Sequence, residues 1–238
     1  MKEIMDRERI NQYLIQYGLE DIFPEGLRQH LALYRFDSDE ALCRQGEKPE
    51  FLFFLVQGKV KVYTTSAEGK TLLINFTTPF EAIGEIECLR DRENLNTVMA
   101  VTEVEAIGIH KRRLSQYEDE ASFLRLLLNM VAQKFYTKSI SLGSHLLYPV
   151  EVRLASYLLS VSPEEKNGAM KRVNMSSIKD MANLIGTSYR HLNRVLQKFS
   201  SEGLVERRRG TLVVKNREGL YAVAGQNIYE REERKEQG

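Results

Sequence analysis

The sequence predicts an α+β protein, and three observations point to this class. Residues 35–111 divide into short apolar segments separated by glycine-containing turns, which is typical of an antiparallel β-domain. A long helix is predicted over 118–142, and two short helices joined by a glycine are predicted near 176–201. Strands and helices do not alternate along the chain, so a parallel α/β sheet is not expected.

The segments of the β-domain indicate a β-sandwich or a barrel-like roll. Phe51–Val56 is an apolar run of the kind that is buried on both faces. Ala67–Gly69 is placed as a hairpin turn that leads into Thr71–Phe76. Before this domain, apolar residues recur at helical spacing up to Gly18, and the first 34 residues are predicted to be helical.

Composition and residue spacing exclude several classes of protein. Hydrophobic residues make up 42% and charged residues 28% of the chain, and no apolar stretch has the length of a signal peptide or a membrane span. A cytoplasmic protein with no membrane partner is therefore expected. Cys43 and Cys88 form no CxxC motif and are expected to be reduced core thiols. The four histidines lack metal-ligand spacing, and no nucleophile–base pair or phosphate loop is seen, so neither a metal site nor an enzyme is expected.

The long helix over 118–142 has two apolar faces. One face has the alternating four-three spacing of a coiled-coil seam, and its residues are Leu124, Leu128, Val131 and Phe135. The second face, expected to pack on the β-domain of the same chain, consists of Leu126, Leu127 and Met130. The seam predicts dimerisation, with a helix buried in its own chain as the alternative. Gly143 and Pro149 bracket a predicted hinge.

The segment SSIKDMANLIGTSYRHLNRVLQKF has the pattern of two helices joined by a tight turn. Gly186 can adopt the left-handed conformation of the turn, Ser188 can cap the second helix, and Ser176 or Ser177 can cap the first. The second helix is expected to bury Leu192, Val195, Leu196 and Phe199. Its opposite face carries Tyr189, Arg190, Asn193, Arg194 and Gln197. Arginine can bind guanine, and asparagine or glutamine can bind adenine, through two hydrogen bonds.

The residues after Gly203 predict a basic wing. Two short strands, Leu204–Arg207 and Thr211–Val214, flank a tip of arginines that are expected to contact phosphate. Residues 170–217 contain eleven Lys or Arg and three acidic residues, whereas the whole chain has a net charge of +1. Such a segment indicates binding to a polyanion, with a solvated basic face as the alternative. The predicted contacts to double-stranded DNA are Ser188, Tyr189, Arg190, Asn193, Arg194, Lys198, Arg207, Arg208 and Arg209.

Residues 24–222 resemble the Crp/Fnr family of bacterial transcription regulators, and most closely its YeiL-type subgroup. Gly46-Glu47, FLFFLVQGKVKVY, Gly69 and IGEIE resemble the family's sensory β-roll, and IGTSYRHLNRVLQKFSSEGLV resembles its recognition helix. The resemblance implies N-terminal helices and an antiparallel β-roll of the cyclic-nucleotide-binding type over 1–117, a dimerisation helix and hinge over 118–145, and a winged helix-turn-helix with a charged tail over 146–238.

The resemblance also implies a function. A homodimer would read a pseudo-palindromic DNA site under the control of a signal at the β-roll, and would contact RNA polymerase if it is an activator. Tyr189, Arg190 and Arg194 match the family's base-contacting positions. Tyr189 stands where better-known members have arginine or glutamate, so a different operator is expected. The alternative is a ligand-binding or protein-docking module of the same fold that no longer binds DNA; the polar, basic face of the second helix argues against it.

By the same resemblance, Gly84, Glu85, Asn96 and Thr97 form the effector pocket. Family members that bind cAMP have an arginine that makes charge-assisted bonds to the cyclic phosphate, where this chain has Asn96. Asparagine cannot neutralise a phosphate, so cAMP binding and a bound cofactor are not expected. The family's iron–sulfur branch needs four cysteines, and this chain has two. Another small molecule, or no ligand, stays open, as does a structural role in which the Glu85 carboxylate accepts backbone N–H bonds.

Overall fold

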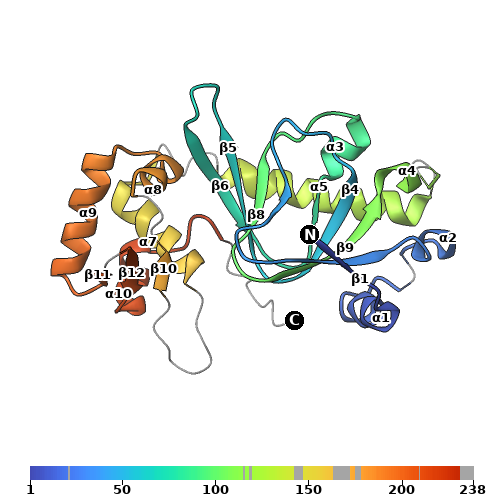
Figure 1. Ribbon diagram of the computed structural model, residues 1–238, viewed down its shortest axis with the longest axis horizontal. Coiled ribbons are helices and arrows are strands. Elements are labelled where there is room, and N and C mark those ends of the chain that lie inside the picture. Colours follow the sequence, from blue (N-terminus) through green and yellow to red (C-terminus); the bar gives the residue numbers. More distant parts are fainter. Residues whose placement is uncertain are drawn as a thin grey trace. The chain divides into compact units, whose positions relative to one another are not determined.

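The computed structural model of the 238-residue chain describes residues 1–20, 22–114, 116–117, 120–141, 147–162, 172–174, 178–208 and 210–230. The chain divides into two units. The first unit comprises Met1–Thr64 and Thr77–Lys138, and the second comprises Thr65–Phe76 and Ser139–Gly238 (Figure 1). No helix among the described residues is long and apolar enough to cross a membrane.

The first unit begins with a strand, β1 (Lys2–Ile4), which is followed by the helices α1 (Arg7–Gln16) and α2 (Glu25–Arg28). Asp6 caps α1 by accepting a hydrogen bond from the backbone N–H of Arg9 at 2.9 Å. The prediction that the first 34 residues are helical is wrong at both ends. β1 pairs antiparallel with β2 (Ala32–Phe36), and this pairing joins segments far apart in the sequence, which helical periodicity cannot reveal.

The β-domain contains two sheets, and the last strand of the second sheet falls mostly in the Thr65–Phe76 segment that is assigned to the second unit. One has the strand order β1-β2-β9-β4-β7 and the other β3-β8-β5-β6. The further strands are β3 (Ala41–Cys43), β4 (Phe51–Gln57), β5 (Val60–Thr65), β6 (Thr71–Thr77), β7 (Glu81–Ile83), β8 (Thr97–Ala100) and β9 (Val104–His110). Successive residues of β4 pack into two different clusters, Phe54 in one and Phe53 and Leu55 in the other. The apolar run 51–56 is therefore buried on both faces, as its sequence predicts.

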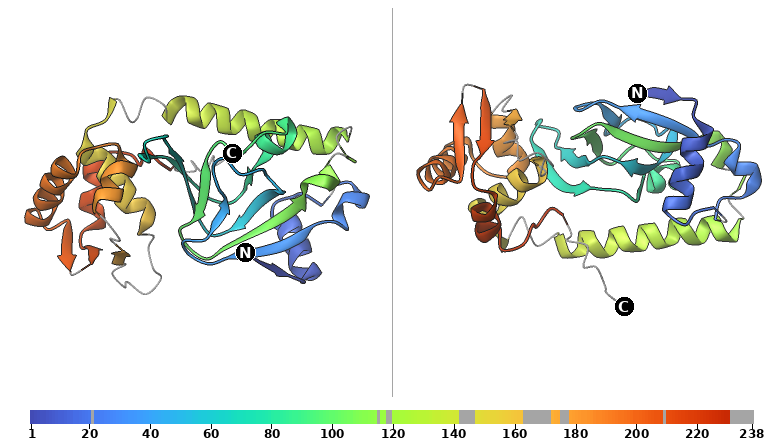
Figure 2. Two further views of the ribbon diagram at one scale, coloured as in Figure 1. Left: turned by 45° about the horizontal axis from the view of Figure 1, so that its top comes forward. Right: turned by 90° about the horizontal axis from the view of Figure 1, so that it is seen from below.

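Three helices accompany this β-domain: α3 (Glu85–Arg90), α4 (Lys111–Leu114) and α5 (Ala121–Ser141). Both views of Figure 2 show α5 running along the strands of the first unit. Phe123 and Leu127 on α5 are each 2% exposed, and Leu126 and Met130 pack against the same core. One face of the long helix thus packs on its own domain, as predicted.

The second unit contains the helices α7 (Val150–Val161), α8 (Ile178–Ile185), α9 (Tyr189–Ser201) and α10 (Arg217–Ala224). Its antiparallel sheet has the order β10-β12-β11, formed by β10 (Arg172–Asn174), β12 (Thr211–Val214) and β11 (Val205–Arg208). Helix α7 contacts α8, α9 and α10. Pro149 precedes α7, whereas Gly143, Ser176 and Ser177 lie outside the described residues.

Candidate functional site

The turn between α8 and α9 is held by backbone geometry and by one buried arginine. Gly186 has a φ of 72°, a conformation that favours glycine, and the backbone N–H of Thr187 donates to the carbonyl of Ala182 at 2.9 Å. Arg153 on α7 is 8% exposed, and its Nη1 donates to the carbonyl of Ile185 at 2.7 Å and to that of Gly186 at 3.3 Å. Its guanidinium therefore satisfies the carbonyls at the C-terminus of α8 and fixes the turn.

The role of Arg153 was not among the features predicted from the sequence. The available signal was its position as the single arginine in the apolar segment of α7, because a buried guanidinium requires acceptors. An arginine in such a segment indicates that it binds carbonyls of a neighbouring element.

Ser188 caps α9, as predicted. Its hydroxyl accepts a hydrogen bond from the backbone N–H of His191 at 3.2 Å. The predicted buried face of α9 is at most 2% exposed at each of its four positions, Leu192, Val195, Leu196 and Phe199. Burial of this face leaves the opposite face of α9 directed outward.

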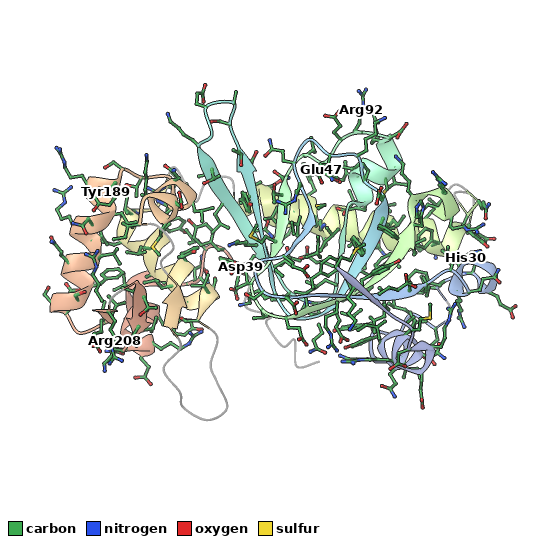
Figure 3. All side chains as sticks on the ribbon, viewed as in Figure 1. His30, Asp39, Glu47, Arg92, Tyr189 and Arg208 are labelled. Atoms are coloured by element: carbon green, nitrogen blue, oxygen red, sulfur yellow. The ribbon has the colours of Figure 1, made fainter. Side chains whose placement is uncertain are left out.

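The outward face of α9 carries the predicted base-contacting residues. Arg190 and Arg194, one helical turn apart, are both exposed and lie opposite the buried face. Tyr189 is 55% exposed at the first position of the helix, where Figure 3 labels it, and Asn193 follows one turn later on the same flank. Lys198 is exposed near the C-terminal end. The helix thus presents three cations and two further polar side chains.

The wing is formed by β11 and β12, and its two described arginines have different partners. Arg207 Nη1 donates to Asn193 Oδ1 on α9 at 2.8 Å. Arg208, labelled in Figure 3, donates from Nε to Glu206 Oε1 at 2.8 Å. Lys215 lies 3.5 Å from the other oxygen of Glu206. Arg209 lies outside the described residues.

The two arginine pairs change the electrostatics of the wing. The hydrogen bond from Arg208 lowers the pKa of Glu206, and the same bond raises the pKa of Arg208. The field of Arg208 is therefore partly compensated by the Glu206 carboxylate before any phosphate approaches, whereas the partner of Arg207 is a neutral amide.

The predicted effector residues lie around the N-terminus of α3. Gly84 precedes α3 with a φ of 86°, and the Glu85 side chain is 3% exposed. Lys134 Nζ on α5 donates to Glu85 Oε1 at 2.9 Å and also to the carbonyl oxygen of Ala82. The partner that the structure gives to the Glu85 carboxylate is thus a lysine side chain.

The other two predicted effector residues lie at the start of β8. Thr97 is buried, and its Oγ1 accepts a hydrogen bond from the backbone N–H of Gln45 at 3.1 Å. Asn96 is half-buried.

The lysine that pairs with Glu85 was not predicted from the sequence. Lys134 lies two turns after Leu127 and therefore on the face of α5 that packs against the domain, which is the signal that could have indicated it.

Two family models match the chain: a cyclic nucleotide-binding domain over residues 33–120 and a Crp-like helix-turn-helix domain over residues 152–223. The chain is 29% identical over 210 residues to the regulatory protein YeiL of Escherichia coli O157:H7, covering 87% of this chain and 92% of that protein. The chain belongs to the Crp/Fnr family of transcription regulators. The predicted resemblance to the family and to its YeiL-type members is confirmed.

Other similar proteins agree with this assignment. The CRP-like cAMP-activated global transcriptional regulator of Mycobacterium tuberculosis (strain CDC 1551 / Oshkosh) is 22% identical over 224 residues, covering 92% of this chain and 98% of that protein. The crystal structure of TTHB099, a CRP-family transcriptional regulator from Thermus thermophilus, matches with a TM-score of 0.65 at 21% identity, over 82% of this chain and 98% of that chain. The predicted α+β fold is confirmed. This Crp/Fnr protein is a DNA-binding transcription regulator with an effector-binding domain.

Most of the predicted dimerisation face of this Crp/Fnr protein lies on the side of α5 away from its own core, whereas Leu124 also borders the domain. Leu128 is 67% exposed and Phe135 is 74% exposed. Leu124 is 39% exposed, and Val131 is half-buried. Together these four residues form a strip of large apolar side chains, which we call the α5 seam.

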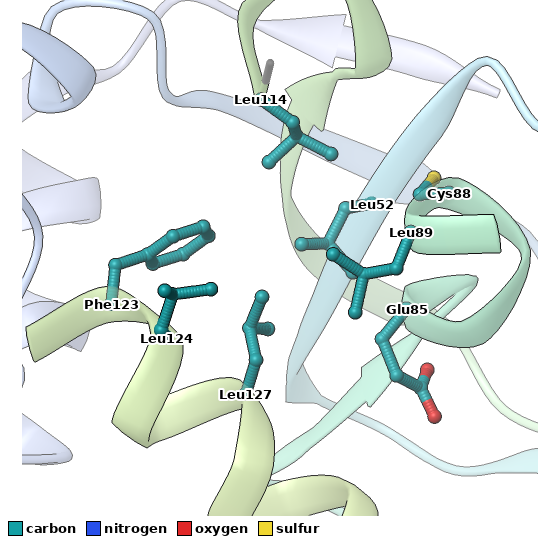
Figure 4. Close-up of a pocket in the computed structure, with 8 residues that line it drawn as sticks. All are labelled: Leu52, Glu85, Cys88, Leu89, Leu114, Phe123, Leu124 and Leu127. Carbon is teal, nitrogen blue, oxygen red and sulfur yellow. The ribbon is translucent and has the colours of Figure 1, made fainter. Parts of the chain in front are cut away.

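An apolar cluster joins the N-terminal half of α5 to α3 and β4 (Figure 4). It encloses a cavity of about 10 Å³, which is at most enough for one water molecule. The lining residues are Leu52, Glu85, Cys88, Leu89, Leu114, Phe123, Leu124 and Leu127, with the Glu85 carboxylate at the margin of the cluster. The cluster therefore functions as packing between α5 and the domain.

Both cysteines of this Crp/Fnr protein are free and half-buried. Burial raises the pKa of the Cys43 thiol to about 12, and burial likewise raises the pKa of the Cys88 thiol to about 12. Among the described residues, no group of three or more His, Cys, Asp or Glu side chains is arranged to hold a metal ion.

Proposed function

We propose that this regulator binds a pseudo-palindromic DNA site as a homodimer, with α9 in the major groove. The observation that carries the proposal is the outward face of α9, where Arg190 and Arg194 project beside Tyr189 at the start of the helix. The first residues of a recognition helix reach the base edges, and arginine reads guanine through two hydrogen bonds. The wing supplies phosphate contacts from Arg207, Arg208 and Arg209.

The α5 seam supports the homodimer. Monomeric proteins rarely expose a continuous strip of large apolar side chains, and two such strips bury each other in a coiled coil. Parallel pairing of two α5 helices would give the dimer a twofold axis. Its two copies of α9 would then reach half-sites one helical turn of DNA apart, about 34 Å.

The β-roll is proposed to control DNA binding in response to a signal other than cAMP. The relative from Mycobacterium tuberculosis is described as cAMP-activated. In this chain, Asn96 offers no cation for a cyclic phosphate, and Glu85 is already paired with Lys134. The protein would act in the cytoplasm, where its DNA is, without enzymatic activity, and would contact RNA polymerase if it activates transcription.

Site selection tests this proposal. The full chain is incubated with random duplexes, bound DNA is recovered and sequenced, and the affinity for the selected site is measured by fluorescence anisotropy. We expect an inverted repeat with half-site centres about 10–11 base pairs apart, bound about a thousandfold or more tightly than random DNA. If no site is enriched, the proposal fails, and a module of the same fold that does not bind DNA becomes the better description.

A further inference from the structure

The Glu85–Lys134 pair joins two elements whose relative position matters for the proposed dimer. Glu85 begins α3 at the edge of the β-roll, and Lys134 lies on α5, the helix that carries the α5 seam. The lysine ammonium lies 2.9 Å from the Glu85 carboxylate and also contacts the carbonyl of Ala82, a residue of β7 that pairs with β4. One side chain of α5 thus engages two acceptors on the roll.

The carboxylate of this pair is buried, whereas the lysine side chain is partly exposed. The Glu85 side chain is 3% exposed and that of Lys134 is 18% exposed. A buried carboxylate is costly unless a cation and hydrogen-bond donors compensate it, and removing one partner of such a pair leaves an uncompensated charge. The position of α5 on the roll is therefore coupled to the presence of the Lys134 ammonium.

We propose that Lys134 closes the effector site from within and takes the place of a ligand at Glu85. The ammonium pairs with Oε1 of the carboxylate to which a hydroxyl-bearing ligand such as a nucleotide would have to donate, and the hydroxyl of such a ligand would bring no charge compensation. The same contact holds α5 on the roll without any small molecule. The regulator then binds its DNA site without a ligand at Glu85, cyclic nucleotides have no effect, and the signal proposed above acts on the roll without occupying Glu85. This inference concerns the regulation of the site proposed above and rests on that proposed function.

Two groups beside the pair already have partners within the protein, and the cavity next to it is small. The adjoining apolar cavity of about 10 Å³ is too small for a nucleotide base. Thr97 Oγ1 accepts from the backbone N–H of Gln45 at 3.1 Å, and Glu87 Oε1 accepts from the backbone N–H of Leu95 at 3.2 Å, so part of the acceptor capacity beside the pair is used within the protein. A ligand could shift the position of α5 only by binding one arrangement better than the other, and here the protein's own lysine already favours one arrangement.

The test combines three variants with a matched control. Lys134→Met removes the ammonium and leaves Glu85 buried without a cation. Glu85→Gln combined with Lys134→Met removes both charges, and Lys134→Arg keeps the positive charge. The control is Lys111→Met, because Lys111 also pairs with a carboxylate in the first unit, at 2.5 Å from Asp91, but that carboxylate is 85% exposed.

Thermal unfolding and nucleotide calorimetry are measured without DNA. We expect Lys134→Met to lower the melting temperature by roughly 5–15 °C, and the double variant to recover most of that loss. Lys111→Met should shift it by less than about 2 °C. Millimolar cAMP or cGMP should give no binding heat with the unaltered protein. Nucleotide binding at Glu85, or a Lys134→Met protein that melts like the control, overturns the inference.

DNA binding is then measured by anisotropy on the selected site, using protein shown by mass spectrometry to carry no bound nucleotide. We expect the unaltered protein to bind without ligand, Lys134→Met to bind about tenfold or more weakly, and Lys134→Arg to bind within about threefold. A tenfold gain on adding cAMP or cGMP overturns the inference. If no DNA site is ever selected, the proposed function fails, whereas the closed effector site is still decided by the unfolding and calorimetry results.

Discussion

At the scale of single residues, the two described arginines of the wing differ in their hydrogen-bond partners. Arg207 is tied to α9 through the amide oxygen of Asn193, and Arg208 is tied within its own strand to Glu206. In these contacts Arg207 uses one of its five N–H donors and Arg208 uses two, so both keep donors for DNA. Asn193 was expected to contact DNA, and in this structure its Oδ1 accepts from Arg207. We therefore expect Asn193 to orient the wing relative to α9 for the DNA binding proposed above.

A double-mutant cycle on this pair tests the coupling. We expect Asn193→Ala and Arg207→Ala each to weaken binding to the selected site, and the double variant to lose less than the sum by about 0.5–1 kcal/mol. Anisotropy titrations at one salt concentration measure all four affinities. Gln197→Ala, exposed on the same helix face, serves as the uncoupled partner in a control cycle with Arg207→Ala. Strict additivity of the Asn193 and Arg207 losses would contradict a shared role.

The two thiols allow a prediction about chemical reactivity. Because burial raises the pKa of Cys43 and of Cys88 from an ordinary 9.0 to about 12, each carries about a thousandfold less thiolate at pH 8 than an ordinary cysteine. Native protein should thus be alkylated by iodoacetamide far more slowly than protein unfolded in urea, as followed by mass spectrometry. Native and unfolded rates within tenfold of each other would instead indicate an accessible, redox-competent pair.

The raised thiol pKa values also set the direction of a pH effect. A raised pKa means that the folded state favours the protonated thiol. The stability this provides is complete below pH 9 and is lost as the pH rises towards 12. Urea titrations at pH 8 and pH 10 should therefore show a lower free energy of unfolding at pH 10, with a smaller decrease in the Cys43→Ala variant.

At the scale of the elements, the sequence of α5 has to meet two requirements. One face of the helix packs on the roll, and the other is proposed to pack on the partner copy of α5. Leu127 and Lys134 lie two turns apart on the face that packs on the roll, whereas Leu128 and Phe135 lie one residue further on and face outward. A single-residue shift along the helix would bring Leu128 and Phe135 onto the packed face. Lys134 on the packed face favours the observed alignment, since there its ammonium contacts the Glu85 carboxylate and the carbonyl of Ala82.

Charge on the α5 seam should separate the proposed dimer. Leu128→Glu and Phe135→Glu each place a carboxylate in the coiled-coil core, where its partner copy supplies a second like charge. We expect sedimentation velocity to show monomers at concentrations where the unaltered protein is dimeric, and binding to the two-half-site DNA to fall by about a hundredfold or more. Ile15→Glu on α1, which alters a side chain that is 60% exposed elsewhere in the first unit, should leave the dimer intact. An unaltered protein that sediments as a monomer would contradict the assignment of the seam.

At the scale of the whole molecule, the features that could be predicted from the sequence are the helices and turns that depend on a few neighbouring residues. Pro149 and the apolar repeat placed α7, and Gly186 with Ser188 placed the turn before α9, because glycine conformation and helix caps are encoded within a few residues. β1 could not be predicted in this way, since its partner strand β2 lies in a distant segment. Lys134 and Arg153 were missed for the same reason. Their acceptors, the Glu85 carboxylate and the carbonyl that ends α8, belong to other elements and are brought close only by the fold.

The charge distribution of the whole chain leads to a last prediction, which separates base reading from phosphate binding. The net charge of +1 conceals a strongly basic DNA-binding segment, so affinity should fall steeply with salt, by about 0.9 log units per log unit of salt for each neutralised phosphate. Arg194→Ala should cost about 1–3 kcal/mol on the selected site and little on random DNA, because it removes a base contact.

Arg208→Ala should instead weaken binding to both DNAs and make the salt dependence shallower. The slope of log affinity against log salt should decrease by less than the loss of two phosphate contacts per dimer would give. The reason is that Glu206 already compensates part of the charge of Arg208. Anisotropy titrations on selected and random duplexes between about 50 and 300 mM salt measure both effects. If the two variants lose affinity equally on both DNAs, α9 does not read bases through Arg194, and the division between helix and wing is wrong.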